Sequence, residues 1–471
     1  MAEAICGKNV FSYISTECFS FLGLIALMRM SAGHEDLGLI MINNIKNSCF
    51  ISICVYNHNY IKLLVIGNTM RNTYILLKQV EQNIISTEVR DYYRDDYYKI
   101  DWDNNVVGLF GERGVGKTTI LLQKRLEMKD NSFYFSADSA YIKSHGLFEF
   151  VFFCYRNFTI KTIFIDEIFK YSNWKQELKN IIDSIPQLKI IFSGSSSMAL
   201  YDGVIDLGRR VYDYKINTLS FREYLKLRYN IELSRITFDE IINNHSEISI
   251  DYSLKLKDVY FAEYLKMGAY PFGLDLNFNS FANKLLKTLN RVILEDLAYI
   301  KNFQTHSLDK LSKLLFFVAN STPSELSINH LSKKIGVDKN LVDNVIYMLS
   351  KIGTINLVQK GDKISEKVRK EYKIFLCDTN KYYVYNLEND KGIIREAFFV
   401  SEIKKMDNID ISLPSKQDFK ITSNKKTFLF EIGGKNKQSK KYSKDTYIIK
   451  DDIIISENEH TIPLWLFGFL N

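Results

Sequence analysis

Cysteine is scarce in this sequence: there are six in 471 residues, and no two of them form a C-x-x-C pair. A zinc site built on cysteine pairs and a disulfide framework both need paired spacings, so the sequence supports neither. This cysteine usage is typical of a reducing compartment. We therefore expect a cytoplasmic protein.

Long hydrophobic runs are missing as well. The apolar stretch 18–28 has only 11 residues, whereas a membrane-spanning helix needs about 20. No clean cleavage pattern of a signal peptide follows this stretch, and no internal repeat or low-complexity tract is evident. The sequence predicts no transmembrane helix and no membrane partner.

The overall composition is that of a folded protein. Hydrophobic residues make up 46% and charged residues 25% of the chain, which is ordinary for globular domains. A chain of this length exceeds one compact core, and we expect about three domains. The net charge of +7 is concentrated in residues 401–450, which hold 12 lysines against 6 acidic residues. Such a surplus attracts nucleic acid or forms a solvated face, and both interpretations stay open.

A complete phosphate-binding loop is present in the sequence. The matching run is Gly111-Glu112-Arg113-Gly114-Val115-Gly116-Lys117-Thr118, continued by Thr119. It fits the pattern G-x-x-x-x-G-K-[ST] and lies between an apolar strand and a helical segment, as the motif requires. Its main-chain N–H groups and helix N-terminus would cradle phosphates, while Lys117 reaches the β- and γ-phosphates and Thr118 ligates magnesium. The sequence therefore predicts ATP and Mg²⁺ as ligands of residues 111–119.

Two acidic residues complete the predicted site. The apolar run 162–165 ends in Asp166 and Glu167. We expect Asp166 to hold the magnesium ion through water and Glu167 to orient the water that attacks the γ-phosphate. Hydrolysis, rather than binding alone, follows mainly from Glu167.

Two further catalytic candidates are less specific. Ser195, with Ser193 close behind, follows the next apolar strand and could hold the attacking water or the γ-phosphate. Arg209, beside Arg210, could meet transition-state charge within the same subunit or from a neighbouring subunit of a homo-oligomer. A plain polar turn and a surface salt bridge are the alternative interpretations.

Strand-like and helical segments alternate from Asp101 onward. The predicted strands are 106–110, 133–136, 162–165, 189–192 and 211–216. This alternation predicts an α/β fold with a parallel sheet, right-handed crossovers and helices on both faces.

The rest of the chain divides by pattern. Residues 217–300 are predicted to be mostly helical. Residues 301–380 show short helices, two of them predicted at 327–334 and 339–351, and strands at 354–358 and 372–377 around a charged loop. This order of elements is the pattern of a winged helix. The expected domains are therefore a P-loop ATPase domain at 70–216, a helical lid at 217–300, a winged-helix domain at 301–380 and a strand-rich, lysine-rich domain at 381–471. Residues 1–69 differ from them, with four of the six cysteines and 8 charged residues. Whether 1–69 are a native segment or an overlong start stays open.

Together these motifs resemble the large bacterial and archaeal family of AAA-like ATPases that end in a restriction-endonuclease-like domain of unknown role. The matching pieces are 111–119, 164–174, 192–196, 208–209, 219–224, 268–271, 430–437 and 462–469. Phe169 stands where such sequences commonly have histidine, and Thr218 stands where proline is usual. Neither is a phosphate ligand, so the resemblance still implies ATP binding.

The C-terminal resemblance implies a nuclease-like fold. A restriction-type nuclease needs carboxylates and a lysine that converge on magnesium. Glu396, Asp418 and Glu431 are the candidates, but Gly433 occupies the expected lysine position, and Lys435 follows two residues late. We therefore predict a degenerate site in a domain kept for binding DNA or RNA.

Three classes of function stay open at this point. They are an ATPase motor or switch that acts on nucleic acid, an ATP-dependent nuclease, and an ATP-gated interaction module without nucleic acid.

Overall fold

The computed structural model describes residues 25–29, 38–42, 58–128, 131–194, 210–293, 305–323, 326–360, 372–386, 388, 390–438 and 445–470. The chain divides into two compact units, Met1–Gln79 and Val80–Asn471. In the first, strand β1 (Ile25–Arg29) pairs antiparallel with β2 (Gly38–Ile42). Helix α1 (His58–Glu88) runs across residue 70, where the P-loop ATPase domain was expected to start.

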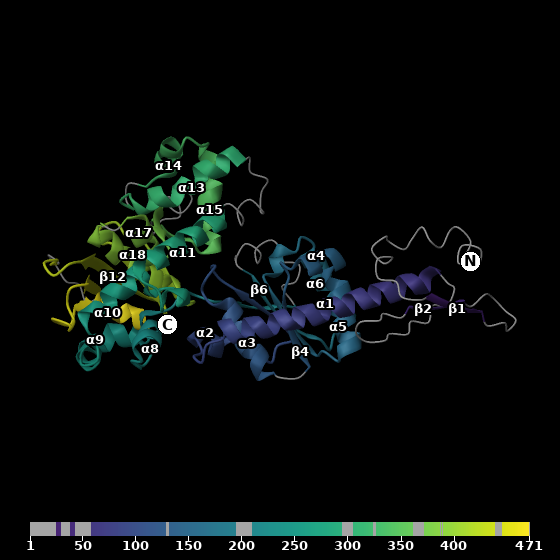
Figure 1. Ribbon diagram of the computed structural model, residues 1–471. Helices are drawn as coiled ribbons and strands as arrows, with labels where there is room; N and C mark the ends of the chain where they lie inside the picture. Colours follow the sequence, from purple (N-terminus) through teal and green to yellow (C-terminus); the bar gives the residue numbers. More distant parts are fainter. Residues whose placement is uncertain are drawn as a thin grey trace. The chain divides into compact units, whose positions relative to one another are not determined.

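A five-stranded parallel sheet forms the first part of the second unit (Figure 1). Its strands, in spatial order, are β4 (Ser132–Ser136), β5 (Thr162–Asp166), β6 (Lys189–Gly194), β3 (Val106–Phe110) and β7 (Tyr212–Lys215). The apolar runs that predicted these strands lie inside the sheet, and every residue of β3 and β5 is buried. The predicted α/β fold with a parallel sheet is confirmed.

Helices cover both faces of this sheet. The helices are α3 (Lys117–Glu127), α4 (Ala140–His145), α5 (Leu147–Phe158) and α6 (Trp174–Ser184), with the short α2 (Asp95–Lys99) before the sheet and the 3-10 turn η3 (Ile168–Lys170) after β5. Helix α3 lies on one face, and α4, α5 and α6 lie on the other (Figure 1). The chain crosses from β3 to the edge strand β4 and then returns across the sheet to β5 and β6. Because right-handed crossovers that advance in opposite directions pass over opposite faces, α3 lies on one face and α4, α5 and α6 lie on the other.

A helical segment follows the sheet, as the loss of strand signals predicted. It comprises α8 (Phe221–Tyr229), α9 (Phe238–Ser253), α10 (Asp258–Glu263), the π-helical turn η4 (Tyr264–Gly268), the 3-10 turn η5 (Pro271–Gly273) and α11 (Phe278–Arg291). Capping boxes begin both α8, through Ser220 and Glu223, and α9, through Thr237 and Glu240. Such reciprocal caps fix where a helix starts.

Three helices and a two-stranded antiparallel sheet come next. They are α13 (Thr305–Ala319), α14 (Ile328–Ile335), α15 (Lys339–Ile352), β8 (Ile355–Gln359) and β9 (Tyr372–Leu376). Helix α14 ends at Gly336 and α15 ends at Gly353, both in the left-handed conformation that favours glycine. The order of elements is the one that the sequence predicted, and the charged loop lies outside the described residues.

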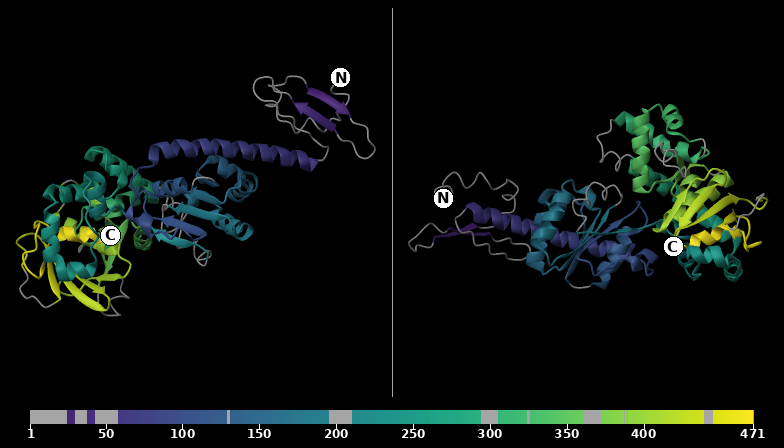
Figure 2. Two further views of the ribbon diagram at one scale, coloured as in Figure 1. Left: turned by 90° about the horizontal axis from the view of Figure 1, so that it is seen from below. Right: turned by 180° about the vertical axis from the view of Figure 1, so that it is seen from behind.

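The C-terminal part is built on a mixed sheet with the order β10-β11-β12-β13-β14. Its elements are α17 (Thr379–Tyr385), α18 (Lys391–Lys404), β10 (Ile409–Ser412), β11 (Phe419–Ser423), β12 (Lys426–Gly433), β13 (Thr446–Lys450), β14 (Thr461–Pro463) and the 3-10 segment η7 (Leu464–Phe469). Figure 2 shows this sheet, in yellow and green, from two further sides. The expected boundary at 380/381 falls inside α17.

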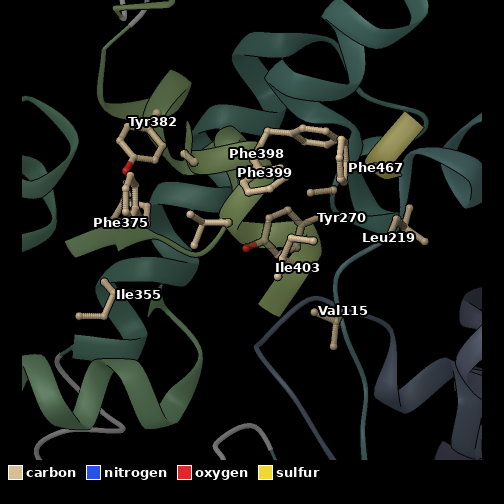
Figure 3. Close-up of a cluster of buried hydrophobic side chains, with 14 of the residues drawn as sticks. Val115, Leu219, Tyr270, Ile355, Phe375, Tyr382, Phe398, Phe399, Ile403 and Phe467 are labelled. Atoms are coloured by element: carbon tan, nitrogen blue, oxygen red, sulfur yellow. Dashed lines mark hydrogen bonds between the residues drawn. The ribbon is translucent and has the colours of Figure 1, made fainter. Parts of the chain in front are cut away.

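Aromatic side chains join the helical segment to the C-terminal sheet. The ring of Phe398 on α18 lies 5.0 Å from that of Phe261 on α10, and the ring of Phe399 lies 4.9 Å from that of Phe467 (centroid distances). Figure 3 shows Tyr270 in the same cluster. Since these rings are buried together, the helical segment and the C-terminal sheet share one core. No helix in the described ranges is long and apolar enough to cross a membrane.

Candidate nucleotide site

The phosphate-binding loop connects the end of β3 to the start of α3. Gly114 and Gly116 have φ angles of 87° and 98°, which residues with a side chain rarely adopt. The Nζ atom of Lys117 donates to the main-chain oxygens of Gly111, at 2.9 Å, and Glu112, at 2.8 Å. The lysine therefore closes the loop on itself at the N-terminus of a helix, where backbone N–H groups favour anions.

A cavity of about 560 Å³ lies over this loop. The loop residues that line it are Arg113, Gly114, Gly116, Lys117, Thr118 and Thr119. Gly111, Glu112 and Val115 line a neighbouring hollow instead. The side chain of Glu112 is buried there and accepts a hydrogen bond from Tyr270 at 3.0 Å.

The cavity also has residues that the sequence did not suggest. Lys284 and Arg291, both on α11, line it. Their spacing of seven places them on one face of the helix. That spacing is the only signal in the sequence, and it gains meaning once α11 is known to lie beside the loop.

The carboxylate of Asp166 receives hydrogen bonds from three hydroxyl groups. Thr118 Oγ1 donates to Asp166 Oδ2 at 2.7 Å, and Tyr134 OH donates to the same atom at 2.9 Å. Ser193 Oγ donates to Asp166 Oδ1. Thr118 and Asp166, the two predicted magnesium ligands, thus lie side by side. Their oxygens are the hard ligands that magnesium prefers.

Glu167 adopts a strained conformation at the edge of the sheet. Its φ and ψ are 51° and 42°, in the left-handed region. Its N–H donates to Ser193 Oγ at 3.0 Å, and the residue lines the cavity together with Lys117 and Thr118. Strain of this kind in a residue other than glycine is common at functional sites.

The remaining catalytic candidates divide between described and undescribed residues. Ser195 and Arg209 lie outside the described residues. Ser193, the second choice at that strand end, is fully buried against Asp166. Arg210 forms an ion pair with Asp183 at 2.8 Å, with about half of each side chain exposed, so this arginine has the surface salt bridge considered as its alternative.

A buried arginine from another part of the chain contacts the main chain of the phosphate-binding loop. Arg94 donates to the main-chain oxygens of Val115 and Asn217, both at 2.7 Å, and pairs with Glu223 at 3.0 Å. Burial alone would raise the pKa of Glu223, but the charge of Arg94, together with the hydrogen bonds that the carboxylate accepts, outweighs burial and lowers this pKa to about 2. No local pattern in the sequence indicates this pair, because its members come from α8 and from a loop before α2.

Comparison with known proteins agrees with this geometry. Residues 103–225 match the family model described as "AAA domain". This segment, which contains the phosphate-binding loop and Asp166, is therefore similar to an AAA domain. Residues 259–382 match a second model, described as "Domain of unknown function (DUF8612)". That segment runs through the expected lid and the three-helix region as one family unit.

A longer stretch of the chain is similar to one archaeal protein. The chain is 29% identical over 312 residues to "Uncharacterized protein MJ1637" of Methanocaldococcus jannaschii, a match that covers 63% of this chain and 64% of that protein. It therefore spans slightly less than two thirds of this relative's length.

Solved structures are less similar still. The walker-type ATPase paby2304 of Pyrococcus abyssi is 13% identical with a TM-score of 0.39, over 63% of this chain and 97% of that one. AMPPCP-bound DnaA from Aquifex aeolicus is 14% identical with a TM-score of 0.24, over 58% of this chain and 87% of that one. Both scores are low, so the description of the site rests on the geometry of this chain.

The C-terminal candidates lie beyond both matched segments, so a restriction-endonuclease-like character stays a prediction. Lys437, rather than the expected Lys435, is the lysine next to the acidic residues: its Nζ lies 3.6 Å from Asp418 Oδ2 and 3.9 Å from Glu431 Oε2. A Cβ on Gly433 would come within 2.6 Å of the Lys437 side chain. The glycine at the expected lysine position therefore leaves the room that Lys437 occupies.

The third C-terminal carboxylate belongs to the same neighbourhood. Glu396 on α18 pairs with Lys373 at 3.2 Å. Burial raises the pKa of Glu396, Lys373 counteracts this, and the negative charge of Asp418 raises it further. Asp418 therefore acts on the charge of Glu396 and shares Lys437 with Glu431.

Proposed function

We propose that this protein hydrolyses ATP at the cavity over residues 111–119. The observation that carries the proposal is the hydrogen bond of 2.7 Å between Thr118 and Asp166. It brings the end of the phosphate-binding loop to the acidic strand end, which is the arrangement that ATP-hydrolysing P-loop proteins use to hold magnesium on the phosphates.

The residues then have separate roles. Lys117 would leave the carbonyls of its own loop for the β- and γ-phosphates, and Thr118 and Asp166 would hold the magnesium ion. Magnesium, when bound, supplies charge that stabilises the phosphates as they separate. Glu167, on the cavity wall, would accept a proton from the attacking water or orient it.

Two substitutions test the proposal. We expect Lys117→Ala to abolish ATP binding, since it removes the loop's phosphate-binding ammonium. Glu167→Gln should keep binding and lower kcat by two orders of magnitude or more, about the contribution of one general base. Nucleotide binding by titration calorimetry and phosphate release measure these effects. Unchanged affinity in the first variant, or unchanged turnover in the second, would move the site elsewhere.

We further propose nucleic acid as the partner on which this ATPase acts. A cavity of about 700 Å³ lies between the three-helix segment and the C-terminal sheet, and its lining includes Lys339, Lys360 and Lys373 together with Asp343 and Asp418. The arrangement of helices and strands supports the predicted winged helix, although α15 carries an acid among its lysines. If these lysines contact phosphates, duplex binding should weaken with salt by about 0.9 in log–log slope for each contact.

A specific control separates this partner from a protein partner. Lys339→Glu should weaken duplex binding and flatten its salt dependence, whereas Lys266→Glu, on the turn η4, should not. Equal binding by wild type and the Lys339 variant at every salt concentration would exclude Lys339 as a phosphate contact, whereas no duplex binding by the wild type would favour the interaction module without nucleic acid.

Cleavage of nucleic acid is the second candidate function. The expected degenerate site rested on the displaced Lys435, and the contacts of Lys437 with Asp418 and Glu431 support this second candidate. Carboxylates with an adjacent lysine are the groups that magnesium-dependent phosphodiester cleavage needs.

A further inference from the structure

A buried polar cluster connects the phosphate-binding loop to α17. Its members are Glu112, Tyr270, Cys377, Asp378 and Lys381. The side chain of Lys381 has no exposed surface, and those of Glu112 and Asp378 are 9% and 5% exposed. Charged groups are seldom buried so deeply unless each is paired.

Lys381 is the centre of this cluster. Its Nζ lies 2.9 Å from Glu112 Oε2, 2.6 Å from Tyr270 OH and 2.8 Å from Cys377 Sγ, and it also contacts the carboxylate of Asp378. These four acceptors share the three N–H groups of the ammonium. Burial disfavours the charge of Lys381, but Asp378 together with the other members of the cluster outweighs burial, so the pKa of Lys381 is well above its ordinary value. The ammonium therefore remains protonated.

The cluster has the ligand types of a metal site, but the ammonium of Lys381 lies among them. Among the described residues, the ligand atoms of Glu112, Cys377 and Asp378 lie within 4.8 Å of one another. The ammonium of Lys381 contacts all three groups. A lysine thus supplies the positive charge that such a ligand set would otherwise take from a cation.

The residues beside Lys381 fasten α17 to the π-helical turn η4. Thr379 Oγ1 donates to the oxygen of Leu265 at 2.7 Å, and Asn380 Nδ2 donates to the same oxygen at 2.9 Å. Asn380 Oδ1 in turn accepts from the N–H of Ala269 at 2.8 Å. The main chain directly before Lys381 is therefore anchored to η4.

Glu112 receives both ammonium groups. Lys117, the predicted phosphate ligand, donates to its main-chain oxygen, and Lys381 donates to its side chain. A phosphate that takes Lys117 removes one of these two bonds, whereas the bond to Lys381 persists and holds the loop. Without that bond, ordering the loop costs free energy at the moment of binding.

We propose that Lys381 is a positioning residue for the nucleotide site, which acts through Glu112 to hold the phosphate-binding loop in its binding conformation. This inference rests on the proposed ATP site. It also makes the α17 segment, far along the chain, a contributor to nucleotide affinity.

Three variants and one matched control test it in the full chain. Lys381→Met removes the ammonium, and Glu112→Gln removes the loop's carboxylate but leaves the pair of Lys381 with Asp378 intact. The third variant combines the two. The control is Lys450→Met, since Lys450 is a buried lysine paired with Glu457 at 2.7 Å in the C-terminal sheet. The measurements are the Kd for ATP with magnesium and hydrogen exchange of the loop amides without nucleotide.

We expect each single variant to raise the Kd about tenfold and to speed exchange in residues 112–118 by a similar factor. The double variant should be no worse than the poorer single variant, because both changes break one link, and Lys450→Met should leave both measurements unchanged. Unchanged Kd and exchange in Glu112→Gln and Lys381→Met, or effects that multiply in the double variant, would overturn the proposal.

The two proposals fail in distinguishable ways. If the wild type does not bind ATP, the proposed function is wrong, but hydrogen exchange of the loop still reports whether Lys381 holds it. If Lys381→Met does not fold, Glu112→Gln alone decides: normal exchange in its loop would refute the link, and faster exchange would support it.

Discussion

Asp166 shows how single side chains from separate elements build the site. Its hydroxyl donors come from α3, β4 and β6, through Thr118, Tyr134 and Ser193. Burial, with Asp166 next to it, raises the pKa of Tyr134, so this hydroxyl stays protonated and can only donate to the carboxylate. The three donors hold the carboxylate in one orientation, which a magnesium ligand needs.

Removal of one donor should therefore affect turnover more than folding. We expect Tyr134→Phe to lower kcat about fivefold, the equivalent of roughly 1 kcal/mol for one hydrogen bond, with ATP affinity nearly unchanged. Phosphate release measures kcat. Tyr141→Phe is the control, because Tyr141 is 45% exposed. Equal kcat in wild type and Tyr134→Phe would mean that Thr118 and Ser193 suffice to orient Asp166.

At this scale the sequence predicted residues that belong to a contiguous motif and missed those that do not. Residues 111–119 and the pair Asp166 and Glu167 follow from local patterns. Tyr134 reads as an ordinary strand residue, and it reaches Asp166 because β4 pairs with β5 in the register that sets Ser136 opposite Asp166. Such a register is a property of the sheet, not of either strand.

At the scale of elements, α8 is positioned by its own cap. Glu223 closes the capping box with Ser220 and also receives Arg94, which donates to the oxygen of Val115 in the phosphate-binding loop. One carboxylate thus links the start of a helix, a buried arginine and the loop. This link explains why Glu223 is almost fully buried although it is charged.

The pair should make stability depend on acid. The folded pKa of Glu223, about 2, lies below its ordinary value of 4.5, so the pair stabilises the fold above pH 4.5 and loses its effect as pH falls toward 2. The difference corresponds to on the order of 3 kcal/mol. We expect Glu223→Gln to lower the free energy of unfolding near pH 7 by about this amount and to flatten its pH dependence in that window.

Urea unfolding between pH 2 and pH 7 measures this effect. Glu240→Gln is a matched control, because Glu240 occupies the same position in the capping box of α9 but is exposed. A parallel pH dependence for wild type and Glu223→Gln would show that other carboxylates cause the acid sensitivity.

Elements with a strong period were the predictable ones. The five strands of the parallel sheet lie where the apolar runs predicted them, with ends that shift by one or two residues. Helices α14 and α15 begin beside Ser327 and Asp338, whose side chains cap them. The spatial order of the strands has no local signal, because it depends on crossovers that pass over intervening strands.

On the scale of the whole molecule, residues distant in sequence assemble each of the two candidate sites. Residues 377–381 were expected at a domain boundary, yet Lys381 contacts Glu112 across more than half the chain. Lys437 reaches Asp418 and Glu431 from the segment that follows β12. Counting residues from Glu431 pointed to Lys435 because spacing along a strand says nothing about a side chain that folds back.

The fold-back of Lys437 allows a sharp test of the C-terminal region. Its ammonium lies within ion-pair distance of Asp418 and Glu431, whereas Lys435, two residues earlier, is exposed. If the region cleaves nucleic acid, Lys437 has the position of the lysine that such a site needs beside its carboxylates. We expect Lys437→Met and Glu431→Ala to lower magnesium-dependent nicking of plasmid DNA at least a hundredfold.

Lys435→Met is the matched control, since it removes the same charge from the same loop without touching the acidic residues. It should keep the nicking rate and lose a little duplex affinity at low salt, because an exposed lysine contributes only through phosphate contacts. Equal nicking in the Lys437 and Lys435 variants would assign the activity to another site. Intact DNA with the wild type would leave this region a binding surface, because the carboxylates then hold Lys437 rather than a metal ion, and the salt slope would remain as its measurable property.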